Sequence, residues 1–134
     1  MTVPLLRERK ESHSPMAMVT AYDSTFASIV DEAGVDLILV GDSVATVMQG
    51  QRNTLGVSMQ DMEYHVRLVA SVKPNALIVG DMSFGSYQSS VKDAVDNAVR
   101  LVKAGAEIVK LEGGIHVAEQ IRAIAAADIP VMGH

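Results

Sequence analysis

Cysteine and tryptophan are absent from this sequence of 134 residues, and aromatic residues make up only 4% of it. Without cysteine, disulfides and thiolate chemistry are excluded, and we expect a reducing, cytoplasmic location. Basic residues are outnumbered by acidic ones, and the net charge of -5 attracts neither nucleic acid nor an anionic membrane. No apolar run reaches the ~20 residues of a membrane span, and the start has no long apolar stretch typical of a secretory signal.

Apolar residues form 49% of the chain, which is typical of a globular core. Their spacing alternates between short continuous runs, typical of buried parallel strands, and helical stripes. Strands are expected at 16–22, 35–41, 76–81, 106–114 and 129–134. Helices are expected at about 3–11, 26–33, 58–73, 90–104 and 115–127, and a loop of about fifteen residues follows Asp42.

This strand–helix alternation predicts right-handed βαβ units and a parallel sheet, an α/β fold. A doubly wound sheet usually carries a glycine-rich phosphate turn after its first strand, and "AYDSTFA" has none. A (β/α)8 TIM barrel uses about thirty residues per unit. Asp42 and Asp81 are 39 residues apart, and Asp81 and Glu112 are 31 apart. Residues 1–134 are therefore interpreted as the N-terminal part of one barrel domain, about four and a half βα units.

Three consecutive strands are each expected to end in a carboxylate: Asp42, Asp81 and Glu112. The carboxyl ends of barrel strands converge on one face, where three like charges would need a cation. Oxygen ligands suit Mg²⁺ or Mn²⁺. Lys110 shares a strand face with Glu112 and can meet an anionic substrate, while Ser43 can donate a hydrogen bond. Taken singly, each acid is more often a helix cap or a turn residue than a ligand, and it is the occurrence of three in register that favours a site.

The four histidines are weaker signals. His13, His65 and His116 have ordinary surface or helix interpretations and lack metal-ligand spacing. His134 ends the last expected strand, at the same face as the acids. None is assigned a role.

Several motifs in order resemble one family, the ketopantoate hydroxymethyltransferases (3-methyl-2-oxobutanoate hydroxymethyltransferases). The matching stretches are "TAYD" at 20–23, "DEAGVDLILVGDS" at 31–43, "TLGVSMQDMEYH" at 54–65, "GDMSFGSY" at 80–87, "VKLEGG" at 109–114 and "IPVMGH" at 129–134. They cover nearly the whole chain, and linked motifs are far more specific than any one alone.

The resemblance implies a Mg²⁺-dependent (β/α)8 barrel that forms homo-oligomers. It implies that Asp42, Asp81 and Glu112 form the metal site, and that Ser43 and Lys110, with Asp42 and Asp81, hold 3-methyl-2-oxobutanoate. Metal chelation would stabilise the substrate's enolate, which attacks the one-carbon unit of 5,10-methylenetetrahydrofolate. The product would be 2-dehydropantoate, a precursor in pantothenate and coenzyme A synthesis.

The chain also departs from the family pattern. Val44 follows "GDS" where a glycine is common nearby, Gly56 replaces the proline of "TLPV", and Ser83 replaces that of "DMPF". The family's general base, a glutamate, lies beyond His134, so we expect no catalytic base within this chain and no activity from it alone. Two alternatives stay open: a Mg²⁺-dependent lyase or mutase of the phosphoenolpyruvate mutase and isocitrate lyase type, and a non-catalytic truncated subunit.

Overall fold

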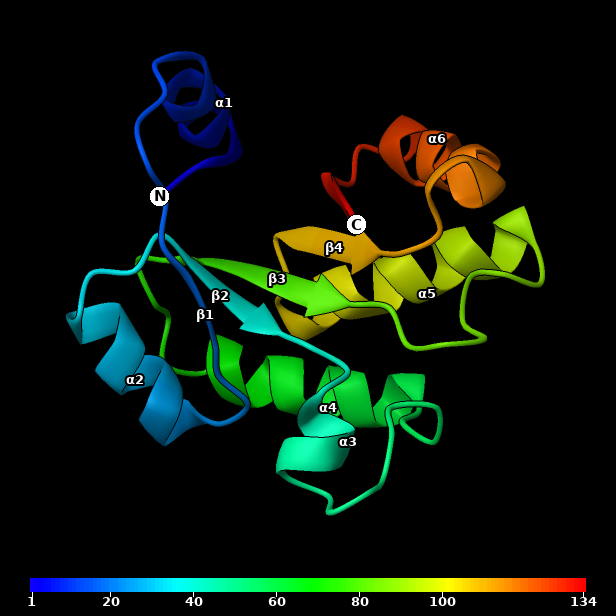
Figure 1. The fold of residues 1–134 in the computed structure, drawn as a ribbon, viewed down its shortest axis with the longest axis horizontal. Helices are drawn as coiled ribbons and strands as arrows, with labels where there is room; N and C mark the ends of the chain where they lie inside the picture. The colour runs from blue at the N-terminus through cyan, green and yellow to red at the C-terminus, as the bar shows by residue number, and fades with distance from the viewer.

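A computed structural model describes residues 1–134, and its centre is a sheet of five parallel strands in the order β1-β2-β3-β4-β5 (Figure 1). The strands are β1 (Met18–Thr20), β2 (Leu37–Val40), β3 (Leu77–Asp81), β4 (Ile108–Leu111) and β5 (Val131–Gly133). Each strand pairs with the next one along the chain, as the predicted βαβ units require.

Helices connect the strands and precede the first. They are α1 (Val3–Glu11), α2 (Ser24–Glu32), α3 (Val44–Val47), α4 (Met59–Ala70), α5 (Val91–Ala104), the 3₁₀ helix η1 (Gly114–Val117) and α6 (Ala118–Ala126). None of them is both long enough and apolar enough to cross a membrane. The predicted alternation of strand and helix is confirmed.

Two helix ends show why the sequence folds locally in this way. The Ser58 hydroxyl accepts from the Asp61 amide while the Asp61 carboxylate accepts from the Ser58 amide, so the expected capping box begins α4. Gly105 ends α5 with a left-handed φ of 117°. A Cβ at that position would lie 2.4 Å from the Cβ of Ala70, so only glycine lets α5 pack this closely on α4.

The sheet has an outer and an inner face with different coverings. On the outer face, α2, α4, α5 and α6 pack on the large core, whose fully buried members include Ile38, Met62 and Leu101. On the inner face, α1 packs on a smaller cluster formed by Leu37, Leu77, Val79 and Ile108. The inner face is therefore the one a closed barrel would enclose.

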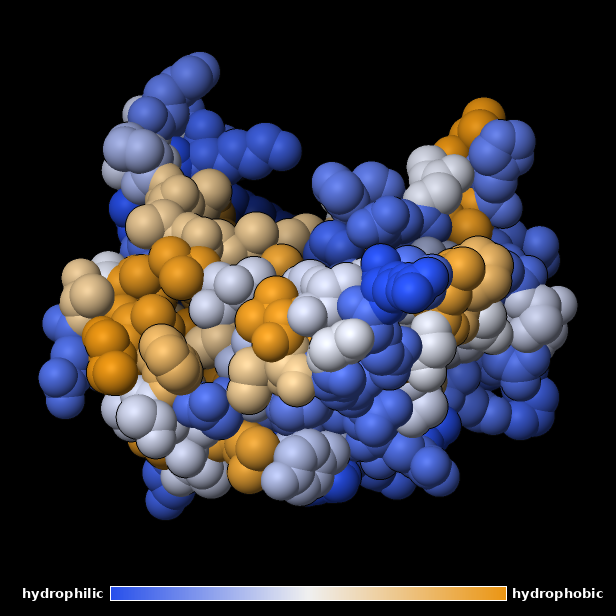
Figure 2. Space-filling view, turned by 60° about the horizontal axis from the view of Figure 1, so that its bottom comes forward, coloured by the Kyte–Doolittle hydropathy of each residue, from blue (hydrophilic) through white to orange (hydrophobic).

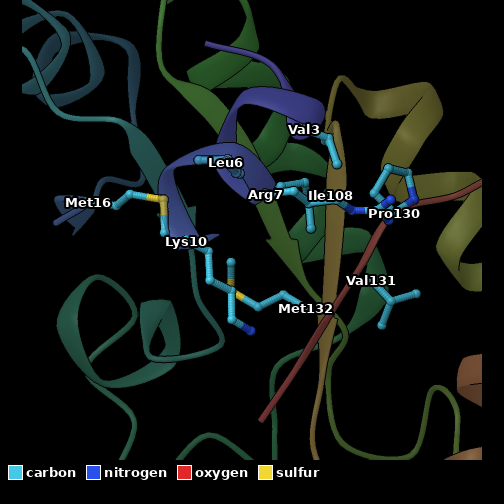
Figure 3. Close-up of a pocket in the computed structure, with 9 residues that line it drawn as sticks. All are labelled: Val3, Leu6, Arg7, Lys10, Met16, Ile108, Pro130, Val131 and Met132. Carbon is cyan, nitrogen blue, oxygen red and sulfur yellow. The ribbon is translucent and has the colours of Figure 1, made fainter. Parts of the chain in front are cut away.

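Helix α1 is held at the amino ends of the strands. Arg9 pairs with the carboxylate of Asp36, which also accepts from the amide of Ala17 at 2.9 Å. These contacts lower the pKa of Asp36, chiefly through the Ala17 amide. A pocket of about 270 Å³ lies between α1 and the first residues of β4 and β5 (Figure 3). It is at the opposite end of the strands from the predicted site.

Two expectations differ from the structure. The region after Asp42 contains the short helix α3 and is not wholly a loop. Phe26 and Ile29 recur at helical spacing with Val30 and Ala33 in the expected helix 26–33, which predicts that they face the core, yet they are 60% and 56% exposed. Strand β1 is an edge of the sheet, so α2 has a neighbouring helix, α4, on one side only. Apolar surface accordingly gathers at the left of Figure 2, the end of the molecule where α2 lies.

Candidate functional site

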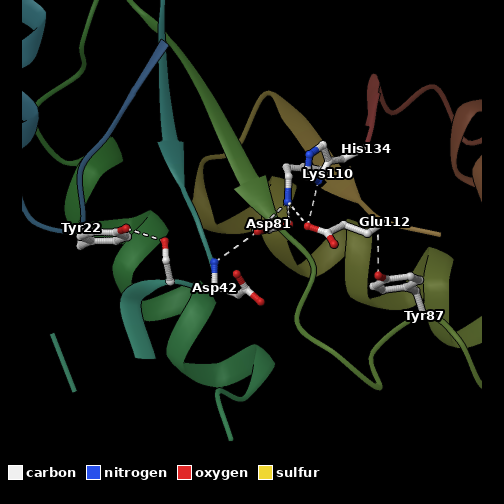
Figure 4. Close-up of polar contacts among 8 residues, drawn as sticks. Tyr22, Asp42, Asp81, Tyr87, Lys110, Glu112 and His134 are labelled. Carbon is white, nitrogen blue, oxygen red and sulfur yellow. Dashed lines mark hydrogen bonds and ion pairs between the residues drawn. The ribbon is translucent and has the colours of Figure 1, made fainter. Parts of the chain in front are cut away.

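The carboxyl ends of the strands surround a pocket of about 130 Å³, which we call the strand-end pocket. Three carboxylates, two small or apolar groups from the α3–α4 loop and three residues that follow β3 line it: Asp42, Asp81, Glu112, Thr54, Leu55, Met82, Phe84 and Tyr87. The three acids predicted to meet at this face therefore do line one pocket. Figure 4 shows their side chains together with their polar contacts.

Parallel pairing and strand alternation bring the charged side chains together. Asp81 ends β3 and is the register partner of Lys110 in β4. Both lie on the inner face, because alternate residues of each strand, Val79 and Ile108, belong to the inner cluster. Glu112 follows Lys110 by two residues and extends from the same face.

Lys110 is the centre of the charge network. Its ammonium donates to both carboxylate oxygens of Asp81, at 2.9 and 3.0 Å, and to Oε1 of Glu112 at 3.0 Å. The Lys110 and Asp81 side chains are only 10% and 5% exposed, whereas that of Glu112 is 55% exposed. The Lys110–Asp81 contact is thus a buried ion pair and the Lys110–Glu112 contact a half-exposed one.

The protonation of these groups follows from burial and pairing. Burial raises the pKa of Asp81, and the hydrogen bonds from Lys110 oppose that rise without cancelling it. Burial opposes the charge of Lys110, but the carboxylates of Asp81 and Glu112 outweigh it and raise the pKa of Lys110. The hydrogen bond from Lys110 lowers the pKa of Glu112. Lys110 is therefore a stable cation beside this pocket, bonded to two of its carboxylates.

Two further groups fix Glu112. The ring of His134 lies with Nδ1 at 3.0 Å from Oε1 of Glu112. The hydroxyl of Tyr87 accepts from the Glu112 backbone amide at 3.2 Å, and burial raises the pKa of Tyr87. Tyr87 was not singled out from the sequence, although it lies within the "GDMSFGSY" motif.

Whether the pocket suits a divalent cation can be judged from its donors. Three carboxylates and one ammonium, Asp42, Asp81, Glu112 and Lys110, leave a formal charge of -2 around all-oxygen donors. The carboxylate of Asp42 accepts no hydrogen bond, while its amide donates to Asp81 at 3.2 Å. No three acidic or histidine side chains converge as a metal-ligand cluster, because the Lys110 ammonium lies between Asp81 and Glu112. The donors fit Mg²⁺ in charge and atom type, with Asp42 the carboxylate free to bind it.

Ser43 lies beside the pocket and not among its lining residues. Its Oγ is 2.7 Å from the hydroxyl of Tyr22, the second residue after β1. The ring of His65 in α4 is buried, and its Nδ1 lies 2.7 Å from the Tyr22 carbonyl oxygen. The surface or helix interpretation of His65 missed this contact. The spacing of His65 from Met62 and Val69 places it on the buried stripe of α4, and this spacing was the signal in the sequence that His65 would be buried.

The fold and the site together define a class: a parallel βα chain with an acidic site at the carboxyl ends of its strands, as in half of a (β/α)8 barrel. The family model described as "Ketopantoate hydroxymethyltransferase" matches residues 1–134, and the chain belongs to this family.

Relatives with curated names support the family assignment. The "3-methyl-2-oxobutanoate hydroxymethyltransferase" of Ignicoccus hospitalis is 54% identical over 134 residues, which are 100% of this chain and 51% of the relative. The protein of the same name from Chromobacterium violaceum is 51% identical with the same coverage. The chain spans about half the length of the curated relatives it matches.

Solved structures show the same fold. Phosphoenolpyruvate phosphomutase from Streptomyces platensis gives a TM-score of 0.79 at 16% identity, covering 99% of this chain and 53% of that one. Phosphonopyruvate hydrolase in complex with oxalate and Mg²⁺ gives 0.78 at 16% identity, covering 97% and 50%. The predicted fold, a barrel-type chain of about half length with parallel strands, is confirmed.

Proposed function

We propose that this chain is the substrate- and metal-binding half of an enzyme that transfers a hydroxymethyl group to 3-methyl-2-oxobutanoate. The donor is 5,10-methylenetetrahydrofolate, and the products are 2-dehydropantoate, used in pantothenate synthesis, and tetrahydrofolate. The observation that carries the proposal is the family match over residues 1–134. The strand-end pocket supports it, because its charges suit an anionic 2-oxoacid together with a divalent cation.

In this proposal Lys110 attracts the substrate carboxylate, and Ser43 donates a hydrogen bond to a substrate oxygen. Asp42, Asp81 and Glu112 hold Mg²⁺ or Mn²⁺, with Asp42 and Asp81 also beside the substrate. The cation supplies positive charge next to the 2-oxo group, which acidifies the hydrogen on C3.

The transfer replaces one C–H bond of the 2-oxoacid by a C–C bond. C3 of the 2-oxoacid loses a proton to a base, and a new bond joins C3 to the methylene carbon. Both bonds from that carbon to the folate nitrogens break, and water supplies the hydroxyl group. The proton taken from C3 and the remaining proton of the water complete the two N–H groups of tetrahydrofolate. We assign the base to the half of the relatives that this chain does not match, because no unpaired base other than Asp42 lines the strand-end pocket. Leu55, Met82 and Phe84 give the pocket apolar walls that help to exclude bulk water.

The alternatives are weaker. Likeness to the phosphomutase and hydrolase structures is at 16% identity and supports the fold alone. A non-catalytic subunit would bind no 2-oxoacid. We further propose that the complete protein is a homo-oligomer and acts in the cytoplasm without nucleic acid or membrane partners.

The test is reconstitution. The chain is co-expressed with the C-terminal half of the Ignicoccus hospitalis relative, and 2-dehydropantoate is measured by mass spectrometry with the 2-oxoacid, the folate and Mg²⁺. We expect product from the pair and none from the chain alone. A pair that co-purifies, is folded and binds neither 2-oxoacid nor divalent cation would refute the proposed function and favour the non-catalytic subunit.

A further inference from the structure

We propose that Tyr22 and His65 are positioning residues, which hold the hydroxyl of Ser43 in one orientation beside the strand-end pocket. The inference rests on the proposed function, because Ser43 is there assigned to binding the 2-oxoacid. It adds two residues, Tyr22 just after β1 and His65 in α4, to the groups on which that binding depends.

The first contact is between two hydroxyl groups. The Tyr22 hydroxyl lies 2.7 Å from Oγ of Ser43, and Tyr22 is only 8% exposed. A hydroxyl has one hydrogen to donate and two acceptor sites. When Tyr22 donates to Ser43, the hydrogen of Ser43 is left for a different acceptor. The same bond polarises Ser43 and makes it a stronger donor to a substrate oxygen.

Ser43 has no competing role for its side chain. It stands at the N-cap position of α3, yet its hydroxyl makes no capping hydrogen bond. Its backbone carbonyl is used instead, accepting from the amide of Val47 and from the hydroxyl of Thr46. The Tyr22 hydroxyl is therefore the group that decides how the Ser43 side chain is turned.

The second contact fixes Tyr22. A carbonyl oxygen can only accept, so the bond of 2.7 Å between Tyr22 O and His65 Nδ1 requires the hydrogen to be on Nδ1. His65 is 9% exposed and lies among the core residues of α4. Strand β1 has three residues and is a sheet edge, so few sheet hydrogen bonds hold its end. The buried imidazole supplies an anchor from a longer helix.

The experiment compares Tyr22→Phe, which removes only the hydroxyl, with Tyr64→Phe. Tyr64 is 54% exposed and makes no side-chain hydrogen bond, so it is the matched control. A second pair tests the anchor: His65→Leu removes the donor, and His65→Asn keeps an N–H near the position of Nδ1. The proteins are studied as the reconstituted pair, or as the chain itself if no pair forms. Thermal midpoints show whether each variant is folded.

Two readouts are taken. The first is the Ser43 side-chain rotamer, from three-bond couplings in labelled protein or from crystals. We expect one rotamer in the parent and in Tyr64→Phe, and several in Tyr22→Phe. The second is the dissociation constant of 3-methyl-2-oxobutanoate with Mg²⁺, measured by calorimetry. Loss of one neutral hydrogen bond should weaken affinity about three- to tenfold in Tyr22→Phe. His65→Leu should weaken it similarly, and His65→Asn should restore it.

The outcomes separate this inference from the proposed function. A parent that binds no 2-oxoacid refutes the proposed function, while the rotamer measurement still decides whether Tyr22 positions Ser43. Suppose instead that the parent binds the 2-oxoacid, and that Tyr22→Phe keeps both the single Ser43 rotamer and the parent's dissociation constant. That result overturns the inference and leaves the proposed function standing. Equal losses in His65→Leu and His65→Asn would show that His65 acts only by packing.

Discussion

Replacing Lys110 by methionine is the change whose cost the structure defines most clearly. The substitution keeps much of the side-chain volume and removes the ammonium that bonds to Asp81 and Glu112. Asp81 would then be a buried carboxylate without its cation, since its side chain is 5% exposed. Breaking a buried ion pair by removing one partner costs about 3–5 kcal/mol. Neutralising the half-exposed partner of Lys110, by Glu112→Gln, should cost at most about 1 kcal/mol, because that side chain is 55% exposed.

Urea unfolding followed by circular dichroism measures both costs, at two protein concentrations so that any self-association is visible. The double variant Lys110→Met, Asp81→Asn should be more stable than Lys110→Met alone, because it no longer leaves a buried charge unpaired. If Lys110→Met does not fold, recovery of folding in the double variant gives the same information. Equal costs for Lys110→Met and Glu112→Gln, or no recovery in the double variant, would refute the reasoning.

Three other perturbations have defined outcomes. Gly105→Ala should destabilise the protein by about 1–3 kcal/mol, through backbone strain and the clash with Ala70. Thermal unfolding should show this variant to be clearly less stable than Gly34→Ala, where open space surrounds the added methyl, and equal losses of stability would contradict the packing argument. Asp36 has a lowered pKa in the folded protein, so its contribution to the free energy of unfolding is present above its unfolded pKa of about 3.9 and is lost as pH falls through the lower folded value. Asp36→Asn should therefore flatten the acid limb of a curve of stability against pH, and an unchanged limb would contradict this role of Asp36. Ser58→Ala should cost about 1 kcal/mol by removing the helix cap of α4, measured by urea unfolding, and a neutral effect would show the cap to be dispensable.

The sequence was sufficient to predict the elements whose signals are local. Continuous apolar runs located all five strands, and the Ser58–Asp61 spacing located the start of α4. It was also sufficient to predict that Asp42, Asp81 and Glu112 lie at one pocket, because the carboxyl ends of successive parallel strands lie on the same face.

What could not be predicted depends on contacts between distant segments. Whether Lys110 would lie between Asp81 and Glu112, or leave the three acids to converge, is decided by side-chain directions on neighbouring strands. The buried contact of His65 with Tyr22 joins positions 43 residues apart and leaves no local signal beyond helical spacing. The exposure of Phe26 follows from the position of α2 at the sheet edge, which helical periodicity does not reveal.

The most direct measurement of the central claim is a titration with Mn²⁺, followed by electron paramagnetic resonance, of the parent, Asp81→Asn and Asp96→Asn in the reconstituted pair. Asp96 is an exposed helix carboxylate outside the pocket and serves as the matched control. We predict one bound Mn²⁺ per chain in the parent and in Asp96→Asn, tightened by 3-methyl-2-oxobutanoate, and at least tenfold weaker binding in Asp81→Asn. Binding that is unchanged in Asp81→Asn, or lost equally in both variants, would contradict a metal and 2-oxoacid site at the carboxyl ends of these strands.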